Sequence, residues 1–74
     1  MEKHDVIERI RGLCPDAEID VRGADCHFEV TVVSEFFRGK RTLQRQQPIL
    51  ALFSEELGSG KLHALSIKAK APGE

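Results

Sequence analysis

The sequence is poor in aromatic residues: it has no Trp, no Tyr and four Phe among 74 residues. Proteins that bind single-stranded nucleic acid by base stacking need more aromatic side chains than this. Neither sign of charge dominates, since 11 Lys and Arg face 12 Asp and Glu. This balance argues against binding to DNA or to anionic membranes through the charge of the whole molecule, although it leaves room for a local basic patch.

Cysteines and long apolar runs are also scarce. Small secreted domains usually carry four or more cysteines, whereas this chain has only Cys14 and Cys26, so we expect two reduced thiols. The apolar runs are far shorter than the roughly 20 residues that span a bilayer, and residues 1–20 lack the apolar segment of a signal peptide. We therefore predict a cytoplasmic protein with no membrane partner.

The length fits one domain over residues 1–74, with residues 71–74 expected to fray. No catalytic signature is present. None of the serines lies in a nucleophile elbow, and Gly58-Ser59-Gly60-Lys61 lacks the spacing of a phosphate-binding loop. We predict that the protein is not an enzyme and has no catalytic residue.

The first half of the chain predicts a helix and a hairpin. Apolar residues at helical spacing indicate an amphipathic helix over residues 4–13, ended by Cys14-Pro15, with Cys14 as an apolar filler. Alternation of apolar and polar residues predicts a strand over Ala17–Arg22, and a second strand begins at Cys26. Gly23-Ala24-Asp25 between them predicts the turn of an antiparallel hairpin.

The second half predicts helices and a third strand. Residues 42–57 form an apolar helical face that Pro48 interrupts, so we expect either a kinked helix or two helices. The second option, with Pro48 in the first turn of the second helix, costs less free energy. Gly58-Ser59-Gly60 should end the helical region, and Leu62–Lys70 reads as a strand.

The element order αββααβ, or αββαβ, predicts an α+β fold. Right-handed crossovers would place the third strand parallel to the second, giving a three-stranded mixed sheet with the helices packed on one face. Gly39 lies where the chain leaves the second strand, at a position that suits positive φ.

Two potential metal ligands fall at matching places in this sheet. Cys26 opens the second predicted strand and His63 lies at the start of the third, both on the helix-facing parity, so parallel neighbours would bring them together. His27 is an alternative to Cys26 if the loop is irregular. A structural zinc site needs four protein ligands, but a thiolate and an imidazole suit an iron–sulfur cluster completed by a partner. The alternative is a strand-end histidine beside a small core cysteine.

A second candidate site is a basic stretch without an acidic residue, and it could hold phosphate groups. No clear base-reading helix accompanies it, and a solvated helix surface is the simpler interpretation. The stretch consists of Arg38, Lys40, Arg41 and Arg45.

Several segments together resemble the BolA-like family. The longest is Val32-Val33-Ser34-Glu35-Phe36-Phe37-Arg38-Gly39-Lys40-Arg41-Thr42-Leu43-Gln44-Arg45-Gln46-Gln47. Phe28-Glu29-Val30, Glu55-Glu56-Leu57 and Leu62-His63-Ala64-Leu65-Ser66-Ile67-Lys68 follow the same family order, so that the resemblance covers residues 20–72. The Gln46-Gln47 pair, where many members have His-Arg, is similar to the acid-stress branch.

The resemblance implies an αββααβ fold like that of type II KH domains. It also implies a partner, a monothiol glutaredoxin with a Cys-Gly-Phe-Ser motif and glutathione, with which such proteins share a 2Fe-2S cluster in iron–sulfur trafficking or in iron or stress regulation. The family histidine matches His63, and its second ligand matches the Cys26-His27 region. Some members are described as DNA-binding transcription regulators, which here would use the basic stretch.

Overall fold

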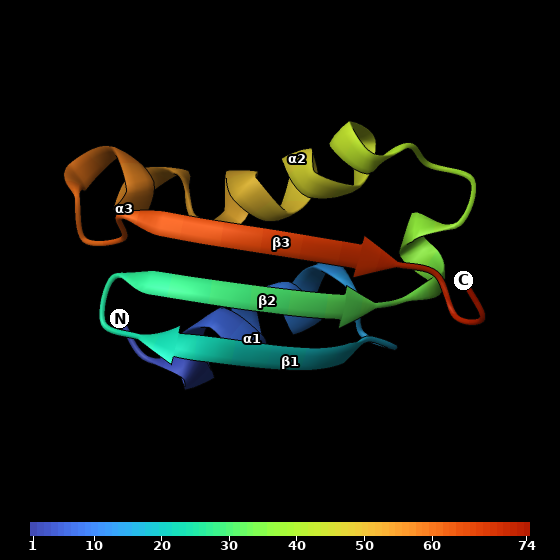
Figure 1. Cartoon of the computed structure of the whole chain (residues 1–74), viewed down its shortest axis with the longest axis horizontal. Helices are drawn as coiled ribbons and strands as arrows, with labels where there is room; N and C mark the ends of the chain where they lie inside the picture. The colour runs from blue at the N-terminus through green and yellow to red at the C-terminus, as the bar shows by residue number, and fades with distance from the viewer.

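The computed structural model describes all residues, 1–74. The chain forms an α+β fold in the order that the sequence predicts, with one additional short 3-10 helix (Figure 1). The elements are α1 (Lys3–Leu13), β1 (Glu18–Ala24), β2 (His27–Val33), the 3-10 helix η1 (Glu35–Phe37), α2 (Thr42–Leu52), α3 (Ser54–Ser59) and β3 (Ala64–Lys70).

The three strands form one mixed sheet in the order β1-β2-β3. β1 pairs antiparallel with β2, and β3 pairs parallel with β2, as predicted. In Figure 1, α1 lies behind β1 and β2, α2 runs alongside β3, and α3 lies at the end where β3 begins. The hairpin loop and the α3–β3 connection therefore lie at one end of the sheet, and η1 and the C-terminal residues lie at the other.

The core lies between the helices and the apolar face of the sheet. Val21, Val30 and Ile67 lie side by side across the three strands, because β2 pairs with β1 and β3 at the same residue. Cys14 is buried in this core, as predicted, and burial raises the pKa of its thiol. The core cluster comprises Val6, Ile10, Cys14, Ala17, Val21, Phe28, Val30, Val32, Phe37, Ile49, Phe53 and Leu62.

Pro48 lies inside α2, so the prediction that it begins a second helix is wrong. The helical region instead divides at Phe53, which is fully buried and caps α2. Burial of this large side chain is worth roughly 1.5–3 kcal/mol, and together with the burial of Ile49 it offsets the cost of a proline inside the helix, which is roughly 3 kcal/mol. Gly60, with φ of 83°, ends α3 as predicted.

The hairpin turn is displaced from its predicted position. β1 continues through Ala24, which pairs with His27, and the loop consists of Asp25 and Cys26, with Asp25 at a positive φ of 59°. Gly23 belongs to the strand, at φ of 98°, and a Cβ there would clash with the carbonyl oxygen of His27. The glycine is therefore needed for the close approach of strands β1 and β2 rather than for the turn itself.

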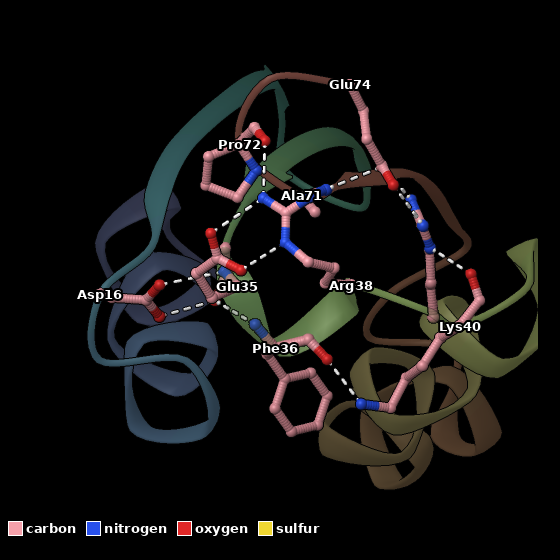
Figure 2. A network of polar contacts seen from close by, with 10 residues as sticks. Asp16, Glu35, Phe36, Arg38, Lys40, Ala71, Pro72 and Glu74 are labelled. Atoms are coloured by element: carbon pink, nitrogen blue, oxygen red, sulfur yellow. Dashed lines mark hydrogen bonds and ion pairs between the residues drawn. The ribbon is translucent and has the colours of Figure 1, made fainter.

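A network of polar contacts lies at the end of the sheet away from the hairpin (Figure 2). Ser34, fully buried, donates to Asp16 at 2.6 Å and accepts from the backbone N–H of Phe36 at 3.1 Å. Asp16 also accepts from the backbone N–H of Glu35 at 3.0 Å. These bonds connect the α1–β1 loop to the segment that follows β2.

The last four residues, predicted to fray, fold back onto this network. Ala71 is buried, and the carbonyl oxygen of Pro72 accepts from Arg38 at 2.8 Å. The Glu74 carboxylate accepts two hydrogen bonds from Arg45, at 2.6 and 2.8 Å, and one from the backbone N–H of Ala71. A local reading of the sequence does not show the two arginine partners, which are 34 and 29 residues away along the chain.

None of the helices is long and apolar enough to cross a membrane.

Candidate functional site

Two connections meet at the N-terminal ends of β2 and β3, which we call the histidine end of the sheet. The backbone N–H of His63 donates to the carbonyl oxygen of Cys26 at 2.7 Å, and that of Ala64 donates to the same oxygen at 3.0 Å. His27 and Ala64 form the first pair of the parallel ladder. Cys26 and His63 are thus held opposite each other, one residue before the strands begin.

The three predicted ligand side chains lie close together at this end. The ring centroids of His27 and His63 are 5.8 Å apart, with an angle of 71° between the ring planes. The Cys26 sulfur lies 3.4 Å from Nδ1 of His27. Both histidines are exposed and Cys26 is half-buried, so an approaching molecule can reach all three.

The predicted strand positions of Cys26 and His63 need correction. Cys26 lies in the two-residue turn rather than in β2, and His63 lies in the connection rather than in β3. Cys26 is half-buried there and His63 is exposed. The positive φ of Asp25 permits the tight turn, which leaves His27 to begin β2.

The histidine end offers three potential ligands, whereas a structural zinc site uses four. No group of three or more His, Cys, Asp or Glu side chains in the chain is arranged to hold a metal ion. The available donors, a thiol and two imidazoles, are of the type that binds iron–sulfur clusters. Their number and exposure fit a site whose remaining ligands come from another molecule.

The basic stretch lies at the opposite end of the molecule, and most of its charge is engaged in internal contacts (Figure 2). Arg38 binds both oxygens of Glu35, at 2.7 and 2.9 Å, in addition to Pro72. Arg45 binds Glu74 and also donates to the backbone carbonyls of Lys40 and Ala69. The paired arginines lower the pKa of Glu35, and that of Glu74 to about 2.

The other two cations of this stretch differ from each other. The Lys40 ammonium donates to the carbonyl oxygen of Phe36 and lies 4.3 Å from the centre of its ring. Arg41 is exposed, and its side chain makes no ion pair. Of the four residues predicted to contact nucleic acid, three therefore support the fold.

An ion pair close to the histidine end was not predicted from the sequence. Arg9 of α1 donates two hydrogen bonds to the Glu56 carboxylate of α3, at 2.7 and 2.8 Å. The residues are 47 positions apart, and each lies on a helix surface where charge is expected. Only the packing of the helices brings them together, so the sequence carries no local signal for the pair.

Comparison with known proteins agrees with this architecture. The family model described as "BolA-like protein" matches residues 3–74. The acid stress protein IbaG of Escherichia coli (strain K12) is 31% identical over 74 residues, covering 100% of this chain and 88% of that protein. An uncharacterized protein from the rpoN-murA intergenic region of Acinetobacter guillouiae is 34% identical over 74 residues, covering 100% of this chain and 89% of its own length.

Solved structures show the same fold. BolA1 from Arabidopsis thaliana superposes with a TM-score of 0.84 at 31% identity, covering 96% of this chain and 92% of that one. The chain belongs to the BolA-like protein family.

Proposed function

We propose that this protein shares a 2Fe-2S cluster with a monothiol glutaredoxin, supplying His63 and one of Cys26 or His27 as ligands. The observation that carries the proposal is the meeting of these three side chains at the histidine end, from two connections far apart in sequence. A cluster of this type accepts both thiolate and imidazole ligands. Two ligands from this chain leave the others to the partner.

The surroundings of the three side chains support a shared site. They lie at the end of the sheet rather than within the core, and both imidazole rings are exposed. A cluster bound between two proteins has to be reached by ligands from both, so exposed donors on a rigid strand end suit the task. The glutaredoxin cysteine and the glutathione thiolate would supply the remaining sulfur ligands. When bound, the cluster would supply the chemistry of electron transfer and of cluster transfer.

Two residues remain candidates for the second ligand, Cys26 and His27. His27 faces His63 directly, with ring centroids 5.8 Å apart, whereas the Cys26 sulfur is at hydrogen-bonding distance from His27. A thiolate at residue 26 or an imidazole at residue 27 could therefore serve with His63. The two choices predict different spectra, because a histidine in place of cysteine changes the ligand field of the iron.

Anaerobic reconstitution with a Cys-Gly-Phe-Ser glutaredoxin, glutathione, iron and sulfide tests the proposal. We expect a one-to-one complex whose visible absorption and circular dichroism differ from those of the glutaredoxin alone, and whose spectrum changes in His63→Ala. His4→Ala is the matched control, since His4 is exposed on α1 and pairs only with Glu8. Cys26→Ala and His27→Ala then identify the second ligand.

A wild-type spectrum identical to that of the glutaredoxin alone would overturn the proposal. So would a complex whose spectrum is the same in wild type and His63→Ala, because His63 would then have no part in binding the cluster.

DNA binding through the basic stretch receives less support. Arg38, Lys40 and Arg45 are engaged by the protein itself, which leaves Arg41 as the member without an internal partner. Each phosphate contact contributes to the salt dependence of DNA binding, so a stretch in which one of four cations lacks an internal partner favours weak binding. Salt titration of DNA binding by wild type and Arg41→Ala measures this alternative separately.

A further inference from the structure

α3 is a short helix whose only apolar contact with the core is the partly buried Leu57. It spans six residues, Ser54–Ser59, and none of its side chains is fully buried. Isolated helices of this length are unstable in water, so α3 needs other contacts to keep its place. The connection that carries His63 begins directly after it, at Gly60.

The strongest polar contact of α3 is the ion pair between Glu56 and Arg9. Arg9 binds both carboxylate oxygens and also donates to the carbonyl oxygen of Leu52, at 3.0 Å, and its guanidinium lies 5.3 Å from the centre of the Phe53 ring. The Glu56 side chain is 16% exposed, so water screens this pair less than an ordinary surface pair. Arg9 of α1 thus contacts Leu52 at the end of α2, the capping residue Phe53, and Glu56 of α3.

Glu56 also holds the connection that leads to His63. Its backbone carbonyl oxygen accepts from the N–H of Leu62 at 3.1 Å, and the N–H of the next residue, His63, donates to Cys26 at 2.7 Å. Leu62 is 1% exposed and belongs to the core. The side chain of Glu56 is therefore bound to α1, and its backbone is bound to the residue directly before His63.

We propose that Arg9 is a positioning residue for His63, acting through Glu56 and the backbone of Leu62. This inference rests on the proposed ligand role of His63 for its consequence in cluster binding, but the placement of His63 can be measured without any cluster. Loss of the Arg9–Glu56 pair should free α3 and the connection while leaving β1 and β2 in place, since neither strand contacts this ion pair through a hydrogen bond.

Hydrogen exchange of the isolated protein tests the placement. In Glu56→Ala we expect the amides of Leu62 and His63 to exchange about tenfold faster than in wild type, after correction for any change in global stability measured at Val30 in central β2. Arg9→Met, which breaks the pair from the other side, should give the same pattern. Glu74→Ala is the matched control, because Glu74 also accepts two hydrogen bonds from one arginine but lies at the opposite end of the sheet.

The glutaredoxin complex supplies the second measurement. We expect Glu56→Ala and Arg9→Met to alter the visible circular dichroism of the cluster in the direction of His63→Ala, and Glu74→Ala to leave it as in wild type. If the Arg9–Glu56 pair only stabilised the fold, Glu56→Ala and Arg9→Met would lower the melting temperature, as Glu74→Ala would, without this spectral difference.

The outcomes separate the two proposals. Equal exchange of the His63 amide in wild type and Glu56→Ala would overturn the positioning role, whatever the cluster does. Faster exchange together with a wild-type spectrum would also overturn it, provided that His63→Ala changes the spectrum. If wild type itself forms no cluster complex, the proposed function fails, whereas the exchange measurement still decides whether Arg9 places His63.

Discussion

Gly23 shows how one residue can determine the shape of the histidine end. It lies in β1 at a φ of 98°, a backbone conformation that residues with a Cβ rarely adopt, and its backbone approaches that of His27 closely. The position of His27, and of the Asp25-Cys26 turn beside it, depends on this contact. The sequence indicated that a glycine was needed near the turn but not that it lay within the strand.

We predict that Gly23→Ala destabilises the protein by about 2 kcal/mol, because the new Cβ would meet the carbonyl oxygen of His27 in a strained backbone conformation. Urea unfolding measures the change. Gly12→Ala is the control: Gly12 is helical, its Cβ would meet nothing within 4 Å, and alanine should stabilise the helix by roughly 0.5–1 kcal/mol. Equal stability of Gly23→Ala and wild type would contradict the account.

Ser34 belongs to the segment that resembles the family, and its contacts could not be inferred from the sequence. Its hydroxyl, buried beside Asp16, connects two loops, and the residues after it bind the C-terminal residues through Arg38. The resemblance identified these residues correctly, but the charge pattern suggested a phosphate-binding surface. Glu74, the acidic partner of Arg45, lies 29 residues away along the chain, and Glu35, the partner of Arg38, lies just before the basic stretch. A run of cations in sequence does not show which of them are already paired.

At the scale of the elements, α2 contains a proline that removes one of its backbone hydrogen bonds. Pro48 is the seventh residue of the helix, so the carbonyl oxygen of Gln44 lacks the N–H donor that any other residue at position 48 would provide. The burial of Ile49 and Phe53 keeps the helix intact in spite of this loss. Local propensity and packing disagree here, and packing determines the observed helix.

We therefore expect Pro48→Ala to stabilise the protein by about 1 kcal/mol. The intrinsic gain of alanine over proline in a helix interior is roughly 3 kcal/mol, reduced by the greater entropy of the unfolded chain and by lost contacts of the half-buried ring. Chemical denaturation would show a higher midpoint with an unchanged slope. Leu43→Ala, at a position 63% exposed on the same helix, should change the stability by less than about 0.5 kcal/mol. A Pro48→Ala protein less stable than wild type would show that the ring is needed.

The element order and strand pairing were predictable because they follow from hydrophobic periodicity and from the rules of crossover connection. Every predicted strand exists, and the register brings Cys26 and His63 opposite each other as expected. The boundaries were less predictable: Cys26 and His63 each lie one residue outside the strands. Contacts between distant residues, such as Arg9 with Glu56, leave no periodic pattern and could not be inferred.

At the scale of the whole molecule, two bidentate arginine–glutamate pairs hold the two ends of the fold. Arg9 and Glu56 connect α1 to α3 near the histidine end, and Arg45 and Glu74 connect α2 to the C-terminal residues at the other. In both pairs the arginine hydrogen bonds are the main cause that lowers the pKa of the glutamate, to about 2. Hydrogen bonds from Ser34 and from the N–H of Glu35 similarly lower the pKa of Asp16.

These pKa values predict how stability depends on pH. An unfolded glutamate has a pKa of 4.5, so each of these two groups binds its proton more readily in the unfolded chain than in the folded one. Their contribution is therefore complete above about pH 4.5 and is lost as the pH falls toward 2. We expect the melting temperature to fall between pH 4.5 and pH 2 through these groups, and to change little through them between pH 5 and pH 7.

The variant Glu56→Gln/Glu74→Gln separates this effect from general acid unfolding. It should melt below wild type at pH 7, because both arginines lose a charged partner, and the difference should shrink as the pH falls and nearly vanish at pH 2, where the wild-type carboxylates are becoming protonated as well. Thermal melting at half-unit steps of pH measures both curves. Parallel curves down to pH 2 would show that the two carboxylates are not held by their arginines in solution, and that other groups fix the ends of the sheet.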